Sequence, residues 1–287
     1  AVLAGVPFLG SLARRPLLSG AHRIAGIVNG TSHAITTALE ANVPFDRALA
    51  EAVKRGYAEP DSSADVSGRD AAEKLTILLR LAGVAGARVE QLTTLGIDGL
   101  TPEDFVAARC LGGTVKPIAL AVLNDDQPGA WVGPAFVLGD HPLARATGVT
   151  NVVQISGGAG RYATAVPDII FQGPGAGPRA TAATIIDDVV EAIDATPAQR
   201  PVAARRVGDI SQPPVGPWCL RLKAEGRVRA EDCRALSTLE LPIARSARTE
   251  HVVAGLTGAV SWRDLQRAVT LARTRGFDVS AFPALLF

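Results

Sequence analysis

Short apolar runs separated by turn residues, between Val115 and Gln172, constrain the fold of this chain more than any other feature. Runs of this length, ended by asparagine, aspartate or glycine, are typical of β-strands. Strands are predicted at 24–29, 115–122, 135–138, 151–155, 163–166 and 169–172. Periodic apolar residues predict helices within 1–20, at 31–42, at 46–55, up to 82, from 101 and at 181–195. The sequence therefore predicts an α+β fold with helices backing a mixed or largely antiparallel sheet.

A second region follows a break in the pattern. The segment 196–217 is rich in proline and arginine and shows no periodicity, which is typical of a linker. Beyond it, strands and helices are predicted in the order βαββαβ, at 218–223, 230–239, 242–247, 251–256, 262–275 and 277–282. That order is the layout of a ferredoxin-like domain. The predicted division is a domain at 1–195, a linker at 196–217 and a small domain at 218–287.

Charge and composition argue against several classes of protein. A formal net charge of +1 gives no large basic surface for nucleic acid, and no apolar run is long enough to cross a membrane. The apolar start of the chain lacks the basic residues that open a signal peptide. The three cysteines are odd in number and scattered, which is typical of the reducing cytoplasm. Neither they nor the four histidines have the spacing of a metal site.

The polar segment from Gly56 to Lys74 carries the most informative chemistry. An acidic turn leads through Gly68 into a predicted helix, on which Asp70 and Lys74 share one face because they stand four residues apart. A lysine beside carboxylates can donate a proton, and the carboxylates can hold a cationic group of a substrate. The alternative is a surface loop followed by an exposed ion pair, which is common on helices and contributes little.

This segment resembles the catalytic segment of homoserine dehydrogenases. The family pattern reads G-Y-x-E-x-D-x-x-x-D-x-x-G-x-D-x-x-x-K, and every lettered position is matched from Gly56 to Lys74. Upstream, residues 26–32 read G-I-V-N-G-T-S, and downstream, residues 173–177 read G-P-G-A-G with Thr181 after them. The three matches follow the family's order and cover about residues 1–192, so the resemblance is specific.

The resemblance implies a role for the charged residues of the segment. Lys74 would donate the proton to the carbonyl oxygen during hydride transfer, while Asp70 would support Lys74 and contact the substrate amine. Glu59 and Asp65 would bind the same amine, because a buried cation needs paired carboxylates to offset its desolvation. Tyr57 would pack over the site, and a purely structural tyrosine is the alternative.

Two loops also have implied roles. Asn29, Gly30 and Thr31 end a strand, where backbone amides at the start of the next helix can meet a carboxylate or phosphate of a ligand. A plain turn is the alternative. Gly175 and Gly177 permit close approach of the backbone, and the resemblance places Gly177 near the nicotinamide end of the cofactor.

Two parts of the family's pattern are incomplete here. Some relatives bind a monovalent cation through backbone carbonyls at positions that correspond to Val2, Ala4 and Val6, but the glutamate that completes the site would precede Ala1. The region 218–287 is similar to the ACT regulatory domain found in relatives. Its Asp-x-Pro-Gly turn is replaced by Lys-Ala-Glu-Gly at 223–226, so binding of an amino-acid effector is not implied.

The implied function is NAD(P)-dependent interconversion of L-homoserine and L-aspartate 4-semialdehyde, in threonine, methionine and isoleucine biosynthesis, by a homodimer or homotetramer. The cofactor, NADP or NAD, would be held mainly by a Rossmann domain, and no G-x-G-x-x-G loop stands near the start of this sequence. We therefore expect this chain alone not to turn over homoserine. Two alternatives remain open: a cofactor-free binding or dimerisation module, and a cofactor-free lyase or isomerase that uses Lys74 and Asp70.

Overall fold

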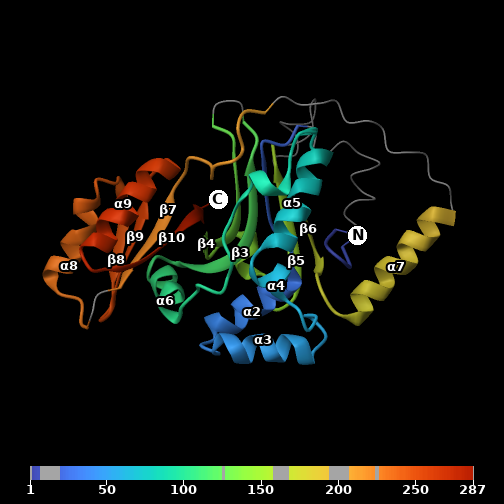
Figure 1. Cartoon of the computed structure of the whole chain (residues 1–287), viewed down its shortest axis with the longest axis horizontal. Helices are drawn as coiled ribbons and strands as arrows, with labels where there is room; N and C mark the ends of the chain where they lie inside the picture. The colour runs from blue at the N-terminus through green and yellow to red at the C-terminus, as the bar shows by residue number, and fades with distance from the viewer. Residues whose placement is uncertain are drawn as a thin grey trace.

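The computed structural model describes residues 2–6, 20–124, 127–157, 168–193, 207–223 and 226–286. Within them, ten strands form one mixed sheet that runs through both halves of the chain (Figure 1). The strands lie in the order β6-β5-β1-β3-β4-β10-β7-β9-β8, and β2 pairs with β4 outside this path. The predicted α+β fold with a mixed sheet is confirmed.

The described elements follow the predicted ones closely. The strands are β1 Arg23–Ile27, β2 Thr93–Thr94, β3 Gly113–Val122, β4 Gly129–Leu138, β5 Thr150–Ser156, β6 Asp168–Pro174, β7 Trp218–Lys223, β8 Ile243–Arg248, β9 Val252–Thr257 and β10 Asp278–Leu285. The helices are α2 Gly30–Glu40, α3 Phe45–Lys54, α4 Ser63–Val66, α5 Arg69–Leu81, α6 Pro102–Cys110, α7 Pro178–Ile193, α8 Ala230–Ala235 and α9 Trp262–Thr274, with the 3-10 helix η4 Leu236–Leu239 after α8.

The central strands are buried on both faces. Along β1 and β3, Ile24 and Ala119 belong to one core cluster, whereas Ala25 and Ile118 belong to another, as the alternation of side chains along a strand requires. Helix α5 contributes Leu75 to the first cluster. Because both faces are covered, these strands read in the sequence as nearly continuous apolar runs.

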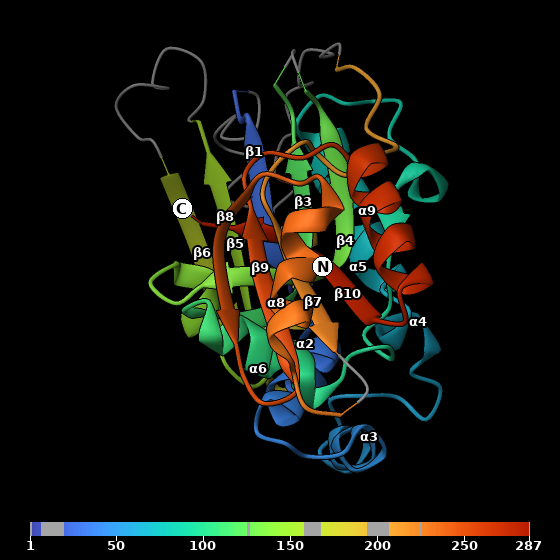
Figure 2. The ribbon, with the colours of Figure 1, turned by 90° about the vertical axis from the view of Figure 1, so that its left-hand side faces the viewer.

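The predicted βαββαβ order of the C-terminal region is confirmed. Its strands lie in the order β10-β7-β9-β8, each antiparallel to its neighbour. Figure 2 shows α8 and α9 lying over one face of these strands. The same core cluster holds Ile118 from β3, Leu220 from β7 and Leu265 from α9. The resemblance to an ACT domain and the exact domain division remain predictions.

The two regions are joined by more than the chain between them. Strand β10 pairs in parallel with β4, through Ala284 opposite Phe136 and Leu285 opposite Val137. The described part of the predicted linker, 207–217, also packs on the sheet, since the Ala130 N–H donates to the carbonyl of Gln212. The pairing of β10 with β4 makes one continuous sheet. Residues 207–217 are held against β4 by a backbone hydrogen bond.

Four local predictions differ from the structure or lie outside it. Within the polar segment, a short helix, α4, stands where a loop was predicted. Strand β4 begins at Gly129, earlier than predicted, because Gly133 and Pro134 interrupt its apolar run without ending the strand. The predicted strand at 163–166 lies outside the described residues, and so does most of the predicted helix within 1–20.

Helix α7 stands apart from the sheet at one end of the molecule (Figure 1). Its side chains include several exposed apolar residues: Ile185, Ile186, Val189, Val190 and Ile193. None of the described helices combines the length and apolar character that a membrane span requires.

Candidate active site

The loop after β1 fixes the first residue of the site. Asn29 is the N-cap of α2, and its Oδ1 accepts a hydrogen bond of 2.7 Å from the backbone N–H of Ser32. The helix thus begins at Gly30, one residue before the predicted start at 31. The capping bond satisfies an otherwise unpaired amide at the helix start and orients the Asn29 side chain.

Asn29 also joins two carboxylates from a distant part of the chain. Its Nδ2 donates to Asp65 Oδ1 at 2.6 Å and to Asp70 Oδ2 at 2.7 Å. An amide nitrogen carries two protons, so both are in use. Asn29 therefore holds together two acids, one on α4 and one on α5, that would otherwise repel each other.

The environment of Asp65 shifts its titration. Burial raises the pKa of this carboxyl above 3.8, and the charge of Asp70 raises it further, while the hydrogen bond from Asn29 and the charge of Lys74 act in the opposite direction. An approaching ammonium group would lower the pKa again, because it favours the charged carboxylate. Asp65 is thus suited to bind a cation.

Lys74 lies in the same cluster. Its Nζ is 2.7 Å from Asp70 Oδ2 and donates to the backbone carbonyl of Val28 at 3.1 Å. An ammonium group has three protons, and these two contacts leave one for a ligand. The lysine side chain is 22% exposed, so a small molecule can reach it.

A neighbouring ion pair on α5 differs from Lys74 and Asp70 in exposure and in partners. Arg69 and Glu73 also stand four residues apart, but their side chains are 72% and 50% exposed. The Lys74 and Asp70 side chains are 22% and 30% exposed and contact a second loop. The two pairs therefore differ in burial, and the Lys74 and Asp70 pair is the less exposed of the two.

Asn151 on β5 is a site residue that the sequence did not reveal. It is fully buried, and its Nδ2 donates to the Val28 carbonyl at 3.4 Å, the same oxygen that accepts from Lys74. Its Oδ1 has no hydrogen-bond partner among the described residues. Asn151 lies within an apolar strand without a local motif, so no sequence signal marks it.

The glycine-rich loop after β6 closes one side of the cluster. A Cβ on Gly175 would lie 2.2 Å from Asn151 Oδ1, and a Cβ on Gly30 would lie 2.9 Å from the Cβ of Ala176. Gly177 has a φ of +109°, and a Cβ there would approach the Tyr57 ring at 3.7 Å. This loop therefore requires glycine for close approach to the site.

Thr31 and Tyr57, two of the remaining predicted residues, are joined by a hydrogen bond between α2 and the polar segment. Thr31 donates its hydroxyl proton to the backbone carbonyl of Tyr57, which ties α2 to the polar segment. Tyr57 is half-buried. Glu59 is exposed, and its side chain makes no hydrogen bond or ion pair to the described part of the chain. Glu59 is thus not joined to the cluster by any contact among the described residues, and its role as a substrate ligand stays a prediction.

Residues 2–6 form a turn beside the glycine-rich loop. The Gly5 N–H donates to the carbonyl of Pro174 at 3.1 Å, and Val2 and Val6 are buried. Leu3 and Ala4 have positive φ values of 72° and 43°. No group of three or more His, Cys, Asp or Glu side chains suited to a metal occurs among the described residues, so a cation here would depend on the carbonyls of Val2, Ala4 and Val6.

Comparison with known proteins gives a consistent picture. A family model described as homoserine dehydrogenase matches residues 7–190. A homoserine dehydrogenase of Mycobacterium leprae is 37% identical over 198 residues, which make up 67% of this chain and 44% of the relative. The chain thus spans less than half the length of this curated relative.

Solved structures extend the comparison to the C-terminal region. The crystal structure of a homoserine dehydrogenase from Thiobacillus denitrificans matches 99% of this chain and 69% of its own, with a TM-score of 0.78 and 28% identity. A hyperthermophilic archaeal homoserine dehydrogenase mutant in complex with NADPH matches 69% of this chain and 56% of its own, with a TM-score of 0.54 and 29% identity.

Proposed function

Because this chain belongs to the homoserine dehydrogenase family, we propose that it supplies the substrate-binding and proton-transfer groups for the NAD(P)-dependent interconversion of L-homoserine and L-aspartate 4-semialdehyde. The observation that carries the proposal is the cluster of Lys74, Asp70, Asp65 and Asn29. It joins a proton donor to two carboxylates on one partly buried surface. Each of these residue types matches one need of the reaction.

The substrate offers an ammonium group and an oxygen that changes between alcohol and carbonyl. Asp65 and Asp70 would bind the ammonium, and the loss of water from that group is offset by two charges of opposite sign. Glu59, which is exposed on the same segment of the sequence, is proposed as a further carboxylate at this end. Tyr57 and the Asn29–Thr31 loop would bound the same space.

Lys74 would move the proton at the reacting oxygen. In the direction of aldehyde reduction its unpaired proton passes to the forming alkoxide, and in the reverse direction the neutral amine accepts the alcohol proton. Asp70 stabilises the ammonium form between these steps. The Val28 carbonyl holds Nζ in place, because it accepts a hydrogen bond from it.

The cofactor, NADP or NAD, supplies or accepts the hydride when bound. Gly175 and Gly177 would lie against it, because glycine lets the backbone of this loop come close to Asn151 and Tyr57 at the site. A monovalent cation at the carbonyls of Val2, Ala4 and Val6 fits less well, because that donor set holds no charged side chain. No step of the proposed reaction depends on the cation.

The proposal includes a cytoplasmic enzyme that acts as a homodimer or homotetramer. Support for self-association comes from the exposed apolar residues of α7 and from Ile170, which is 42% exposed on the edge strand β6. Light scattering of the purified chain tests this part independently of activity. A monomer at all concentrations would contradict it.

Calorimetric titration of the chain with L-homoserine tests the binding half of the proposal. We expect a dissociation constant of about 1 mM or below and a loss of binding in Asp70→Asn. Glu73→Gln is the matched control, since it removes an exposed acid from the same helix. Equal binding by the two variants would refute the assignment.

A chimera tests the chemical half. In the chimera, the part of the Thiobacillus denitrificans enzyme that matches this chain is replaced by this chain. The measured activity is the oxidation of homoserine with NADP. We expect Lys74→Met to lower kcat by at least about 100-fold, because general acid–base catalysis contributes that much or more. Arg69→Met is the control and should retain activity. An active Lys74→Met chimera would exclude the proton-transfer role.

A further inference from the structure

A pocket of about 660 Å³, lined by none of the candidate active-site residues, lies between the two regions of the chain. One wall is the segment 93–101 with parts of β4, and the other is α9 with β10. This volume is in the range of small-molecule sites, which occur preferentially where two structural units meet. The proposed dehydrogenase chemistry does not use it.

The floor of the pocket is aromatic and apolar. Trp131 and Trp262 line it together with Leu265 and Val269. The ring centroids of Trp131 and Trp262 are 6.1 Å apart, and each also contacts Trp218. These are all three tryptophans of the chain. The faces of such rings attract cations as well as apolar groups.

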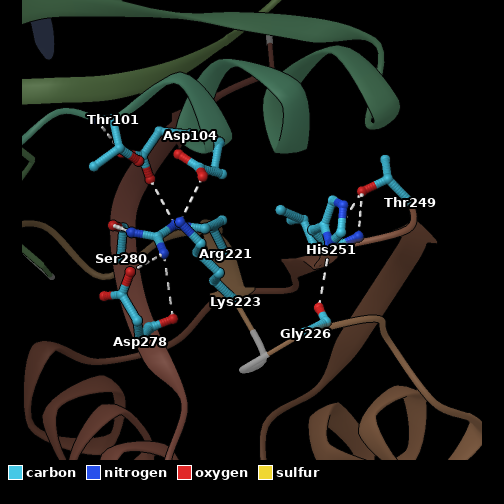
Figure 3. A network of polar contacts seen from close by, with 11 residues as sticks. Thr101, Asp104, Arg221, Lys223, Gly226, Thr249, His251, Asp278 and Ser280 are labelled. Carbon is cyan, nitrogen blue, oxygen red and sulfur yellow. Dashed lines mark hydrogen bonds and ion pairs between the residues drawn. The ribbon is translucent and has the colours of Figure 1, made fainter.

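Two carboxylates and two guanidinium groups line the pocket, and a third carboxylate, Asp104, lies behind Arg221. Arg221 is buried and donates to Asp104 at 2.9 Å, to Asp278 at 2.6 Å and to Ser280, as Figure 3 shows. Asp98 lines the pocket without any ion pair or hydrogen bond to the described residues. Asp98 and Asp278 line the pocket together with Arg221 and the exposed Arg273, and the buried Asp104 offsets part of the Arg221 charge from behind.

We propose that this pocket binds a small organic ammonium compound with an apolar body. The apolar part would lie against Trp262, Leu265 and Val269, and the ammonium group would reach Asp98 and the free oxygen of Asp278. An anion would meet these carboxylates instead, since the Arg221 guanidinium is already held by two acids and a serine.

The segment 93–101, which forms one wall of the pocket, also contacts the segment that carries Asp65 and Asp70. The Ile97 N–H donates to the carbonyl of Val66 at 2.9 Å, and Val66 is the residue after Asp65. Gly68, with a φ of +83°, lets the start of α5 approach Thr94, since a Cβ there would lie 3.0 Å from its side chain. Ligand binding would therefore restrain the backbone that carries Asp65 and Asp70. This coupling rests on the proposed function, whereas binding in the pocket does not.

Intrinsic fluorescence measures binding directly, because every tryptophan of the chain is in or beside the pocket. Three probes share one apolar body: phenethylamine, 3-phenylpropionate and phenylalanine. We expect a saturable change with phenethylamine and a much weaker one with 3-phenylpropionate. No saturable change with the amine, or equal binding of the carboxylate, would overturn the proposal. Phenylalanine binding as tightly as the amine would also overturn the proposal, because the site would then accept a zwitterion as well as a cation.

Variants locate the bound probe. Val269→Trp fills the pocket and should abolish the response to phenethylamine, while Asp98→Asn should weaken binding about fivefold. Glu240→Gln removes an exposed carboxylate outside the pocket and should change nothing. Unaltered binding of phenethylamine in both pocket variants would contradict the assignment. If Val269→Trp fails to fold, unaltered binding in Asp98→Asn alone would contradict it.

Hydrogen exchange tests the coupling separately. Saturating phenethylamine should slow exchange of the amides in 63–72 and leave those of α7 unchanged. Binding without this protection would remove the coupling and leave the pocket site intact. Loss of homoserine binding in the active-site tests would not affect the fluorescence result, so the two proposals fail in distinguishable ways.

Discussion

At the scale of single residues, two asparagines organise the candidate site without being its reactive groups. Asn29 links Asp65 to Asp70 and also caps α2, while Asn151 and Lys74 share the Val28 carbonyl. A buried carbonyl with two donors fixes both of them. The position of Lys74 therefore depends on a strand that is far from it in the sequence.

The raised pKa of Asp65 predicts how homoserine binding depends on pH. Below this pKa the carboxyl is neutral and cannot pair with an ammonium group, so affinity should fall as pH is lowered from about 7 to about 4. Calorimetric titration across that range measures the effect. Asp65→Asn should bind weakly at every pH and lose the dependence.

The control for this prediction is Asp61→Asn in the same segment. Asp61 is exposed, and hydrogen bonds from Ser63 hold its pKa below 3.8. Its replacement should leave the pH dependence of binding as it is in the parent chain. If Asp65→Asn retained that dependence, another group would be responsible.

Removal of Asn151 should reduce catalysis more than binding. In the chimera, we expect Asn151→Ala to lower kcat about tenfold and to change the dissociation constant of homoserine less than twofold, because misplaced groups slow the chemical step. Gln154→Ala, a buried polar residue on the same strand, should keep kcat. Equal losses of kcat and affinity would indicate a structural role for Asn151.

Much of this site was predictable from the sequence, because most of its residues lie in three short motifs. Asp70 and Lys74 are four residues apart on a helix, so their proximity follows from helical geometry. The bridge from Asn29 to both acids was not predictable, since it joins α2 to residues 36 and 41 positions later. Asn151 was missed for the same reason, since its partner Val28 stands 123 positions earlier in the sequence.

At the scale of elements, α6 connects the two regions. The sequence predicted a helix from 101, and the structure begins α6 at Pro102 after a capping box between Thr101 and Asp104. The same Asp104 pairs with Arg221 on β7, which the sequence could not show because the residues are 117 positions apart. One carboxylate thus serves a local and a long-range function.

Asp104→Ala should destabilise the chain by about 3 kcal/mol, because the exposed Asp278 is then the one carboxylate among the described residues that pairs with the buried Arg221 charge. Urea unfolding followed by circular dichroism measures the difference. Glu103→Ala is the matched control, since its pair with Lys223 is partly exposed and should contribute less than about 1 kcal/mol. Similar losses in the two variants would contradict this assignment.

At the scale of the whole molecule, the sheet could be predicted only in part. The βαββαβ order emerged from the pattern of apolar runs, and it is confirmed. The pairing of β10 with β4 and of β2 with β4 was not predicted, because each involves two aligned residue pairs and no turn that would mark it. Such pairings are set by packing of the whole sheet.

A buried histidine predicts how global stability depends on acid. Burial lowers the pKa of His33 from 6.5 to about 4, and the charge of Lys116 contributes. Between these values the unfolded chain binds a proton that the folded chain does not, so stability is complete above pH 6.5 and falls as pH decreases. The loss by pH 4 should approach about 3 kcal/mol.

His33→Phe tests this effect, since it removes the titration while keeping a ring in the core. Urea unfolding at a series of pH values should show a shallower loss of stability between pH 6.5 and 4 than in the parent chain. His22→Phe is the control, because His22 is exposed at the start of β1. An unchanged slope in His33→Phe would assign the acid sensitivity elsewhere.

The pairing of β10 with β4 also has a consequence for biosynthesis. During translation, β4 leaves the ribosome long before β10 does, so the edge at Phe136 and Val137 remains open until the last strand has been made. An open edge can pair with a strand of another nascent chain. Ribosome-bound intermediates of this protein should therefore need a chaperone at that edge until β10 arrives.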